Sequence, residues 1–199
     1  VEFMPNIVPV EDEDISKQME RSMKKAGVNI MTNASVERID TSGNGVKAFV
    51  KTAKGEEVLE ADILLSAVGI KTNIENIGLE ETGIAVDKDK ILVNGYYQTN
   101  VPGYYAIGDV TPGQALAHVA SAEGILCVEK IAGLHVDALD YGNIPGCTYA
   151  TPEIASVGMT EKQAKEKGYE LKIGKFPFSA SGKAKAAGTP DGFVKVIFD

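Results

Sequence analysis

The chain has 199 residues, 44% of them hydrophobic, which suffices for one large domain or two small ones with their own cores. Acidic residues outnumber basic ones by 28 to 20, for a formal net charge of -8. Sequence-independent binding to nucleic acid or to anionic lipid requires a surplus of Lys and Arg, so the charge argues against both classes of partner. No apolar run approaches the ~20 residues of a membrane span and no signal-peptide pattern is present, so we expect a cytoplasmic protein.

The two cysteines, Cys127 and Cys147, lie 20 residues apart and form neither a Cys-x-x-Cys redox pair nor a zinc ligand set. We expect both to be buried thiols, the usual environment of free cysteine, and we expect no metal site. The chain starts at Val1-Glu2-Phe3 and stops at Phe198-Asp199, in both cases inside a predicted strand. We therefore expect these residues to be part of a longer protein.

In chain order, the first predicted element is a helix over about 12–26. Acidic residues lie at its start, apolar residues follow at helical spacing, and Gly27 stands where the helix should end. Three strands are predicted next, over 28–31, 36–39 and 46–52. Asn44-Gly45, before the last of them, is a hairpin turn signal, and Lys54-Gly55 predicts a second turn.

The apolar run Ala61–Gly69 has polar residues on either side, which is typical of a strand buried on both faces of a parallel sheet. Helix, strand, antiparallel insert and buried strand in this order predict half of a doubly wound α/β domain. The first strand and glycine-rich turn of such a domain would have to precede Val1.

The second half of the chain alternates helices and strands. A helix over about 114–132 should end at Gly133, and a linker follows over 141–145. The remaining predicted elements are a Thr-capped helix over 160–167 and strands over 171–176 and 193–198.

The stretch Thr99–Asp109, TNVPGYYAIGD, is the most specific motif of the chain. It predicts a turn at Pro102-Gly103 and a short buried strand that ends on Asp109. Ligands of open α/β sheets bind at the carboxyl ends of strands, and a carboxylate accepts strong hydrogen bonds from a polyol. Asp109 is thus a candidate ligand-binding residue; alternatively, it merely caps the next helix. His118 is predicted on the first turn of that helix, where backbone N–H groups can meet an electron-rich ring edge.

Glu2 is the last residue of another presumed strand, Val1-Glu2. In a dinucleotide-binding fold, an acid at this place accepts hydrogen bonds from the adenosine ribose and disfavours a 2′-phosphate. The other interpretation is an exposed Glu at a strand end. Gly69 also has two interpretations: a glycine at the end of a strand permits either the close approach of a ligand or a simple turn.

Four stretches together resemble one known family. TNVPGYYAIGD, ALAHVASAEG, TYATPEIASVGMTEKQAKEKGY and KFPFSASGKAKA are similar to segments of the flavin-dependent pyridine nucleotide–disulfide oxidoreductases, and the resemblance covers essentially all 199 residues. It implies the α/β class: the later part of a Rossmann-like NAD domain (1–75), a central FAD-contacting domain (76–143), and the first half of an α+β dimerisation domain (144–199).

The resemblance also implies cofactor-binding residues. Glu2 would hold the NAD adenosine ribose, Val36 would pack near the adenine, and Gly69 would pass close to the nicotinamide. Asp109 would hydrogen-bond the flavin ribitol at the turn made by Gly108. The residues expected to line the flavin are Ala115, Leu116, Ala117 and His118. No catalytic residue is expected among the 199, because the family's Cys-x-x-x-x-Cys pair, its glycine fingerprints and its His-x-x-x-x-Glu segment are not in this sequence.

The implied activity belongs to the parent protein: an oxidoreductase that uses FAD, a redox disulfide and NAD+ to oxidise protein-bound dihydrolipoamide. Its partners would be the lipoyl domains of 2-oxoacid dehydrogenase or glycine-cleavage complexes, and a second copy in a homodimer. We expect the 199 residues alone to be inactive. The alternatives are an NADPH-linked reductase of the glutathione or mercuric type, which Glu2 argues against, and a non-catalytic dimerisation or binding module.

Overall fold

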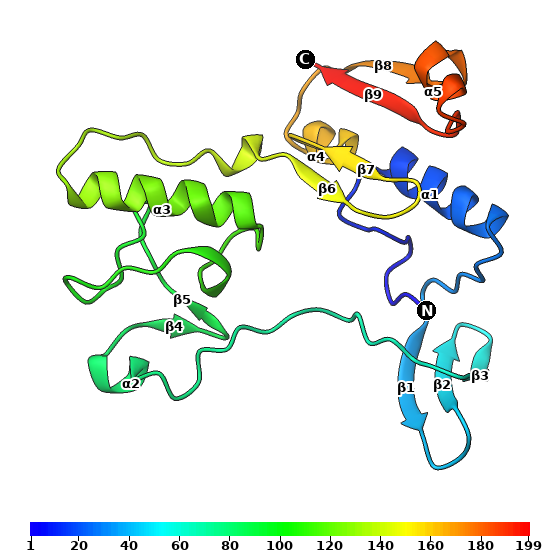
Figure 1. Ribbon diagram of the computed structural model, residues 1–199, viewed down its shortest axis with the longest axis horizontal. Helices are drawn as coiled ribbons and strands as arrows, with labels where there is room; N and C mark the ends of the chain where they lie inside the picture. Colours follow the sequence, from blue (N-terminus) through cyan, green and yellow to red (C-terminus); the bar gives the residue numbers. More distant parts are fainter. The chain divides into compact units, whose positions relative to one another are not determined.

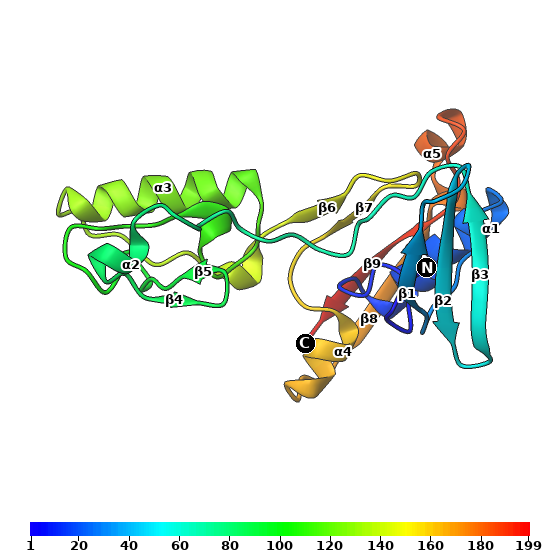
Figure 2. The same ribbon diagram turned by 90° about the horizontal axis from the view of Figure 1, so that it is seen from below.

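The computed structural model describes residues 1–199, in which helices and short strands mix as expected for the α/β class. The chain divides into two compact units (Figures 1 and 2). Unit 1 combines Val1–Ser66 with Pro145–Asp199, and unit 2 is Ala67–Ile144.

The main sheet of unit 1 is an antiparallel meander of three strands, which Figure 2 shows side by side. The strands are β1 (Ser35–Asp40), β2 (Val46–Thr52) and β3 (Gly55–Ala61). Both predicted turns are confirmed. Gly45 has φ +84°, and a Cβ there would lie 2.6 Å from the carbonyl oxygen of Ala61, so only glycine fits this turn. The core of the sheet is small and is formed by Ala34, Ala48 and Val50, with Met31, Leu59 and Leu64 packed against it.

Helix α1 (Glu13–Lys25) also forms as predicted. The Asp12 carboxylate caps it by accepting the backbone N–H of Asp14 at 3.0 Å, and Gly27 follows its end with φ +89°. Met19 on its inner face is 1% exposed, so the helix packs through one apolar stripe.

The C-terminal part of unit 1 consists of two antiparallel ribbons and short helices. These elements are β6 (Gly146–Thr148), β7 (Ile154–Ser156), α4 (Glu161–Glu166), β8 (Lys172–Pro177), the 3-10 turn η3 (Phe178–Ala180), α5 (Gly182–Ala186) and β9 (Phe193–Phe198). The predicted Thr cap of α4 is confirmed as a capping box, in which Thr160 and Gln163 exchange hydrogen bonds. The strands predicted over 171–176 and 193–198 pair as β8 and β9.

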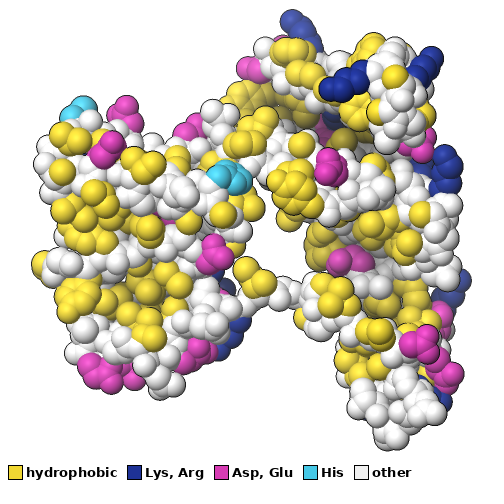
Figure 3. Space-filling view, in the orientation of Figure 1, with side chains coloured by type: hydrophobic (Ala, Val, Ile, Leu, Met, Phe, Trp, Pro, Cys, Tyr) yellow, Lys and Arg dark blue, Asp and Glu magenta, His cyan; other side chains and the backbone are white.

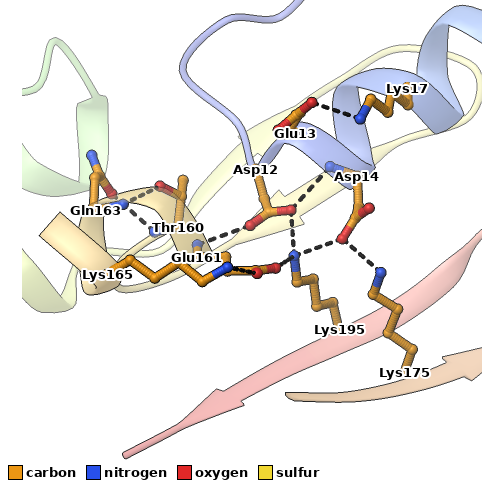
Figure 4. Close-up of polar contacts among 10 residues, drawn as sticks. All are labelled: Asp12, Glu13, Asp14, Lys17, Thr160, Glu161, Gln163, Lys165, Lys175 and Lys195. Carbon is orange, nitrogen blue, oxygen red and sulfur yellow. Dashed lines mark hydrogen bonds and ion pairs between the residues drawn. The ribbon is translucent and has the colours of Figure 1, made fainter. Parts of the chain in front are cut away.

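A buried lysine joins this C-terminal part to α1 (Figure 4). The Lys195 side chain on β9 is 5% exposed, and its Nζ lies 2.7 Å from a carboxylate oxygen of each of three acids. We call these residues the Lys195 cluster: Asp12, Asp14, Glu161 and Lys195. The other oxygen of Asp12 accepts the backbone N–H of Glu161 at 2.9 Å, so one carboxylate links the starts of α1 and α4.

The charges of the Lys195 cluster shift its ionisation. Hydrogen bonds from Lys175 and Lys195 lower the pKa of Asp14 to about 2, and hydrogen bonds from Lys165 and Lys195 lower that of Glu161 to about 2. Burial alone would lower the pKa of Lys195, but the three carboxylates outweigh it and raise that pKa. All members are therefore charged at neutral pH.

Unit 2 is built around one long helix. Its elements are α2 (Leu79–Thr82), β4 (Val86–Asp87), β5 (Lys90–Ile91), the 3-10 turn η1 (Gly108–Val110), α3 (Ala117–Ile131) and the 3-10 turn η2 (Tyr141–Asn143). The helix predicted over 114–132 is thus confirmed as α3, which lies along one side of the unit while α2, β4 and β5 lie on the other (Figures 1 and 2). No helix of either unit has the length and apolar character to cross a membrane.

The strands predicted over 1–2, 28–31 and 61–69 do not form. Residues 62–70 are extended without a sheet partner, and Leu65 and Val68 are 87% and 96% exposed. A strand of a parallel sheet needs neighbours for its backbone groups, and the 199 residues form only antiparallel pairs. Residues 28–31 form no ladder with the chain start: Glu2 N–H donates a hydrogen bond of 2.7 Å to the Met31 carbonyl, and the next backbone bonds to the chain start come from Asn33 and Ala34.

Two burial predictions are also wrong. Tyr104–Ile107 is not a buried strand: it makes one bridge, between Gln98 and Tyr105, and Ile107 remains 39% exposed. Cys127 is buried in α3 as expected, but Cys147 is exposed because it lies on the two-stranded ribbon β6–β7, which is too thin to cover it.

We expect Lys195→Met to open the Lys195 cluster, because it leaves three carboxylates without their shared cation. The free energy of opening of α1, measured by amide hydrogen exchange, should fall by about 3 kcal/mol. Lys17→Met is the control, since Lys17 pairs with Glu13 on the exposed surface of the same helix and should leave that energy nearly unchanged. Equal effects of the two variants would contradict the role of Lys195.

Low pH should break the ion pairs of the Lys195 cluster. Both lowered carboxyl pKa values mean that the contribution of Asp14 and Glu161 to stability is fully present above their ordinary values, 3.8 and 4.5, and is lost as the pH falls toward about 2. Carbon-detected NMR titration should give midpoints of about 2 for both side chains. Midpoints at the ordinary values would show that the ion pairs do not persist in solution.

Candidate functional site

The candidate site begins at the turn η1, which the preceding segment holds in place. Backbone hydrogen bonds of 3.0 Å run from Thr99 N–H to the Tyr104 carbonyl and from Ala106 N–H to the Tyr97 carbonyl. These bonds fold residues 97–106 back on themselves and so position Gly108, the first residue of η1. Its φ is +73°, and a Cβ there would lie 3.2 Å from the Cβ of Ala120, so glycine lets the turn lie close against α3.

Asp109 follows in this turn with its side chain exposed. The structure gives its carboxylate no hydrogen bond or ion pair, so the interpretation of Asp109 as a cap of the next helix is wrong. The backbone carbonyl of Asp109 is held instead, because it accepts a hydrogen bond of 2.6 Å from the Lys90 ammonium. The turn is thus fixed through its backbone while the carboxylate stays available to a ligand.

The predicted flavin-lining residues occupy the start of α3. The helix begins at Ala117, so His118 lies on its first turn as predicted, and Leu116 precedes it in an extended conformation with no side-chain cap. Ala115, Ala117 and His118 are exposed and Leu116 is half-buried. An uncapped helix start presents backbone N–H groups and a positive dipole end, which suit carbonyl oxygens or anionic groups of a ligand.

A buried acid that the sequence analysis missed lies behind the turn. Glu123, in the middle of α3, is 2% exposed. Its carboxylate accepts the backbone N–H of Gly108 at 2.6 Å and the hydroxyl of Tyr141 at 2.5 Å, and the hydroxyls of Tyr97 and Tyr141 lie 3.2 Å apart. Burial, followed by the hydrogen bonds to Glu123 and Tyr97, raises the pKa of Tyr141, so this hydroxyl remains a donor.

One signal in the sequence could have revealed Glu123. It lies four residues after Val119 and four before Cys127, both of which are buried. It therefore shares the inner face of α3 with apolar side chains, where an acid needs a specific partner.

In unit 1, Glu2 and Val36 lie near the same stretch of backbone. The backbone N–H of Ala34 donates a hydrogen bond of 3.1 Å to the backbone carbonyl of Glu2. Val36 lies two residues after Ala34, on β1, and is 42% exposed. The Oε1 atom of Glu2 accepts the Met4 N–H at 2.7 Å, which orients the carboxylate and leaves Oε2 without a hydrogen bond. This arrangement suits the hydroxyl groups of a sugar.

Gly69 differs from the other predicted site residues. It has φ +128°, so its backbone conformation favours glycine, but no atom lies within 4 Å of the place where a Cβ would be. It belongs to the exposed segment 62–70. The 199 residues therefore build no pocket around Gly69.

The residues present fit FAD. Asp109 offers an unpaired carboxylate for hydroxyl groups, and the uncapped start of α3 offers amide groups for a carbonyl-bearing ring. Cys127 fits no redox role, because burial raises the pKa of its thiol and Cys147 belongs to the other unit.

Comparisons with known proteins show the family of the chain. The family model for pyridine nucleotide-disulphide oxidoreductases matches residues 1–124, and the model for the dimerisation domain of the same family matches residues 144–199. The chain is 48% identical to dihydrolipoyl dehydrogenase of Rhizobium etli over 100% of its own length and 42% of that protein. It is 46% identical to leghemoglobin reductase of Glycine max over 99% of its own length and 38% of that protein.

Solved structures are similar as well. LpdA of Mycobacterium tuberculosis gives a TM-score of 0.88 at 26% identity, covering 98% of this chain and 42% of that one. The HOCl-induced flavoprotein disulfide reductase RclA of Escherichia coli gives 0.89 at 29% identity, covering 99% and 45%. The chain thus spans less than half the length of these relatives. With more than half of its residues matched by the family model, the chain belongs to the pyridine nucleotide-disulphide oxidoreductase family, whose cofactors are FAD and NAD.

Proposed function

We propose that the whole protein to which these residues belong is a dihydrolipoyl dehydrogenase. It would oxidise protein-bound dihydrolipoamide to lipoamide and reduce NAD+ to NADH. The observation that carries this proposal is the identity of 43–48% to dihydrolipoyl dehydrogenases of several bacteria and plants across the length of the chain. The exposed carboxylate of Asp109 beside an uncapped helix supports it, because a flavin needs such groups.

In this proposal, FAD supplies the chemistry that links dithiol oxidation to nicotinamide reduction. The chain's own residues bind and orient. The Asp109 carboxylate accepts hydrogen bonds from hydroxyl groups of the ribityl chain, and the start of α3, at Ala117 and His118, directs backbone N–H groups toward the electron-rich edge of the ring. The structure holds the Asp109 backbone through Lys90, so the carboxylate needs little ordering on binding.

Glu2 has the corresponding role toward NAD+. Its oriented carboxylate accepts hydrogen bonds from the adenosine ribose, and its charge repels a 2′-phosphate. The following residues, Phe3-Met4-Pro5-Asn6, include no base that could bind such a phosphate. This argues against an NADPH-linked reductase of the glutathione or mercuric type.

Two parts of the reaction lie outside these residues. Cys127 and Cys147 lie in different units, one buried and one exposed, and do not form a redox pair. We propose that the redox disulfide and the catalytic His and Glu belong to other parts of the whole protein, and that the 199 residues alone are inactive. The lipoyl domains of 2-oxoacid dehydrogenase or glycine-cleavage complexes would deliver the substrate.

The function is tested by assaying the purified whole protein for NADH formation from dihydrolipoamide and NAD+. Replacing Asp109 by Ala should weaken FAD binding by about 10- to 100-fold, since it removes hydrogen bonds to a charged acceptor. Asp137→Ala, which alters an exposed acid in a loop of the same unit, is the control and should leave FAD binding unchanged. Turnover of glutathione disulfide with NADPH but not of dihydrolipoamide would overturn the proposal.

We further propose that the protein is a homodimer that associates through residues 144–199. The side chains of β9 alternate between the two faces of the strand. Lys195 points toward the acids of the Lys195 cluster, whereas Val194, Val196 and Phe198 are 47%, 44% and 58% exposed. Large hydrophobic side chains lie exposed elsewhere too, and Figure 3 shows many on its visible face. The matched dimerisation domain makes the outward face of β9 the first candidate for contact.

Replacing Val196 by Glu should weaken the dimer about tenfold or more, because association would then bury an unpaired charge. Sedimentation velocity across a range of concentrations measures the effect. Val10→Glu places the same charge on a side chain that is 81% exposed and outside the dimerisation domain, so the dimer should be unaffected. A dimer unchanged by Val196→Glu would exclude this face.

A further inference from the structure

Glu123 is a carboxylate inside a protein core, and its partners explain why it is tolerated there. An unpaired buried acid is strongly destabilising, whereas two good donors can compensate the loss of water. Glu123 has both: the Gly108 N–H at 2.6 Å and the Tyr141 hydroxyl at 2.5 Å. The short distances are typical of hydrogen bonds to a charged acceptor.

The first donor places Glu123 next to the candidate site. Gly108 directly precedes Asp109 and has a left-handed backbone conformation. The direction in which the Asp109 side chain points therefore depends on how the backbone of Gly108 is held. Glu123 holds the N–H of Gly108 from inside the core. Lys90 holds the carbonyl of Asp109 at 2.6 Å from the other end of the turn. Two side chains of opposite charge therefore fix the backbone on both sides of the Asp109 side chain.

Tyr141 extends this arrangement to the loop after the turn. A Cβ on Gly113 would lie 3.2 Å from the Cε1 atom of Tyr141, so the tyrosine ring packs on the loop between Asp109 and Ala115. The same side chain donates its hydroxyl to Glu123 and meets the Tyr97 hydroxyl. One network thus contacts η1, the loop after it and the middle of α3.

We propose that Glu123 is a positioning residue for flavin binding: through the Gly108 N–H it sets the direction of Asp109, and Tyr141 orients the Glu123 carboxylate. Glu123 does not touch the flavin in this account. It acts through Gly108, and Lys90 restrains the same turn from the solvent side. The proposal rests on the proposed function, because it assumes that the ligand of Asp109 is a flavin.

The test uses the whole protein and three variants. Glu123→Ala removes the acceptor, Glu123→Gln retains one carbonyl oxygen for Gly108, and Tyr141→Phe removes only the hydroxyl. Cys127→Ala is the control, since Cys127 is 5% exposed on the same face of α3, one turn further on. The readouts are amide exchange of Gly108 in the flavin-free protein and the dissociation constant of FAD.

We expect Glu123→Ala to accelerate exchange of the Gly108 amide by about tenfold or more, and to weaken FAD binding by a similar factor. Glu123→Gln should recover most of both losses, and Tyr141→Phe should show a smaller loss of the same kind. Cys127→Ala should lower the melting temperature but leave Gly108 exchange and FAD affinity within about twofold of the wild type.

Equal effects of Glu123→Ala and Cys127→Ala on exchange and affinity would overturn the proposal, because they would show a general packing role. So would an unchanged Gly108 amide in Glu123→Ala. If Glu123→Ala is too unstable to purify, Tyr141→Phe carries the same comparison. A wild-type protein that binds no FAD would instead refute the proposed function, and the exchange data would still show whether Glu123 holds the turn.

Discussion

A charge removed from water must be paired, and in each unit one buried charge brings together separate elements of the fold. In unit 1 that charge is Lys195, which joins the start of α1 to the start of α4 across more than a hundred residues. In unit 2 it is Glu123, which joins α3 to the turn η1 and to Tyr141. Apolar cores in this chain are small, so these pairings decide much of the local arrangement.

The two charges differ in their consequences. The Lys195 cluster connects the middle of β9 to the starts of α1 and α4 (Figure 4). It contains none of the predicted ligand residues, so its role is to hold the two parts of unit 1 together. Glu123 instead acts on the residue next to an exposed carboxylate. A buried polar network of this kind restricts the backbone to one conformation only when every member is satisfied, as it is here. Restriction of Asp109 before binding would lower the cost of ordering the site.

Local signals predicted the local structure well. The predicted turn at Asn44-Gly45, the glycine after α1 and the Thr160 cap of α4 each depend on neighbouring residues only. Each appears in the structure. The strand predicted over Ala61–Gly69 did not form. Its apolar residues are typical of a strand with neighbouring strands on both sides, and these residues have no such neighbours in the structure.

The residues of the candidate site also divide into those that local sequence indicates and those that only the fold reveals. Sequence alone indicated Asp109 and the start of α3, whose roles toward the flavin remain predictions. It could not place Glu123 behind Gly108, because an acid in a helix is usually exposed and only the fold shows that this one is buried. Lys90 was missed for the same reason: its contact with the Asp109 carbonyl spans 19 residues and depends on how unit 2 folds.

The central claim is that the turn Gly108–Val110 and the start of α3 form one half of a flavin site. It is tested most directly by comparing amide hydrogen exchange of the whole protein with and without bound FAD. The account predicts that FAD slows exchange at 108–110 and 115–119 far more than in the middle of α3, which is already protected by its helical hydrogen bonds. Exchange at both segments that is identical with and without FAD would contradict it.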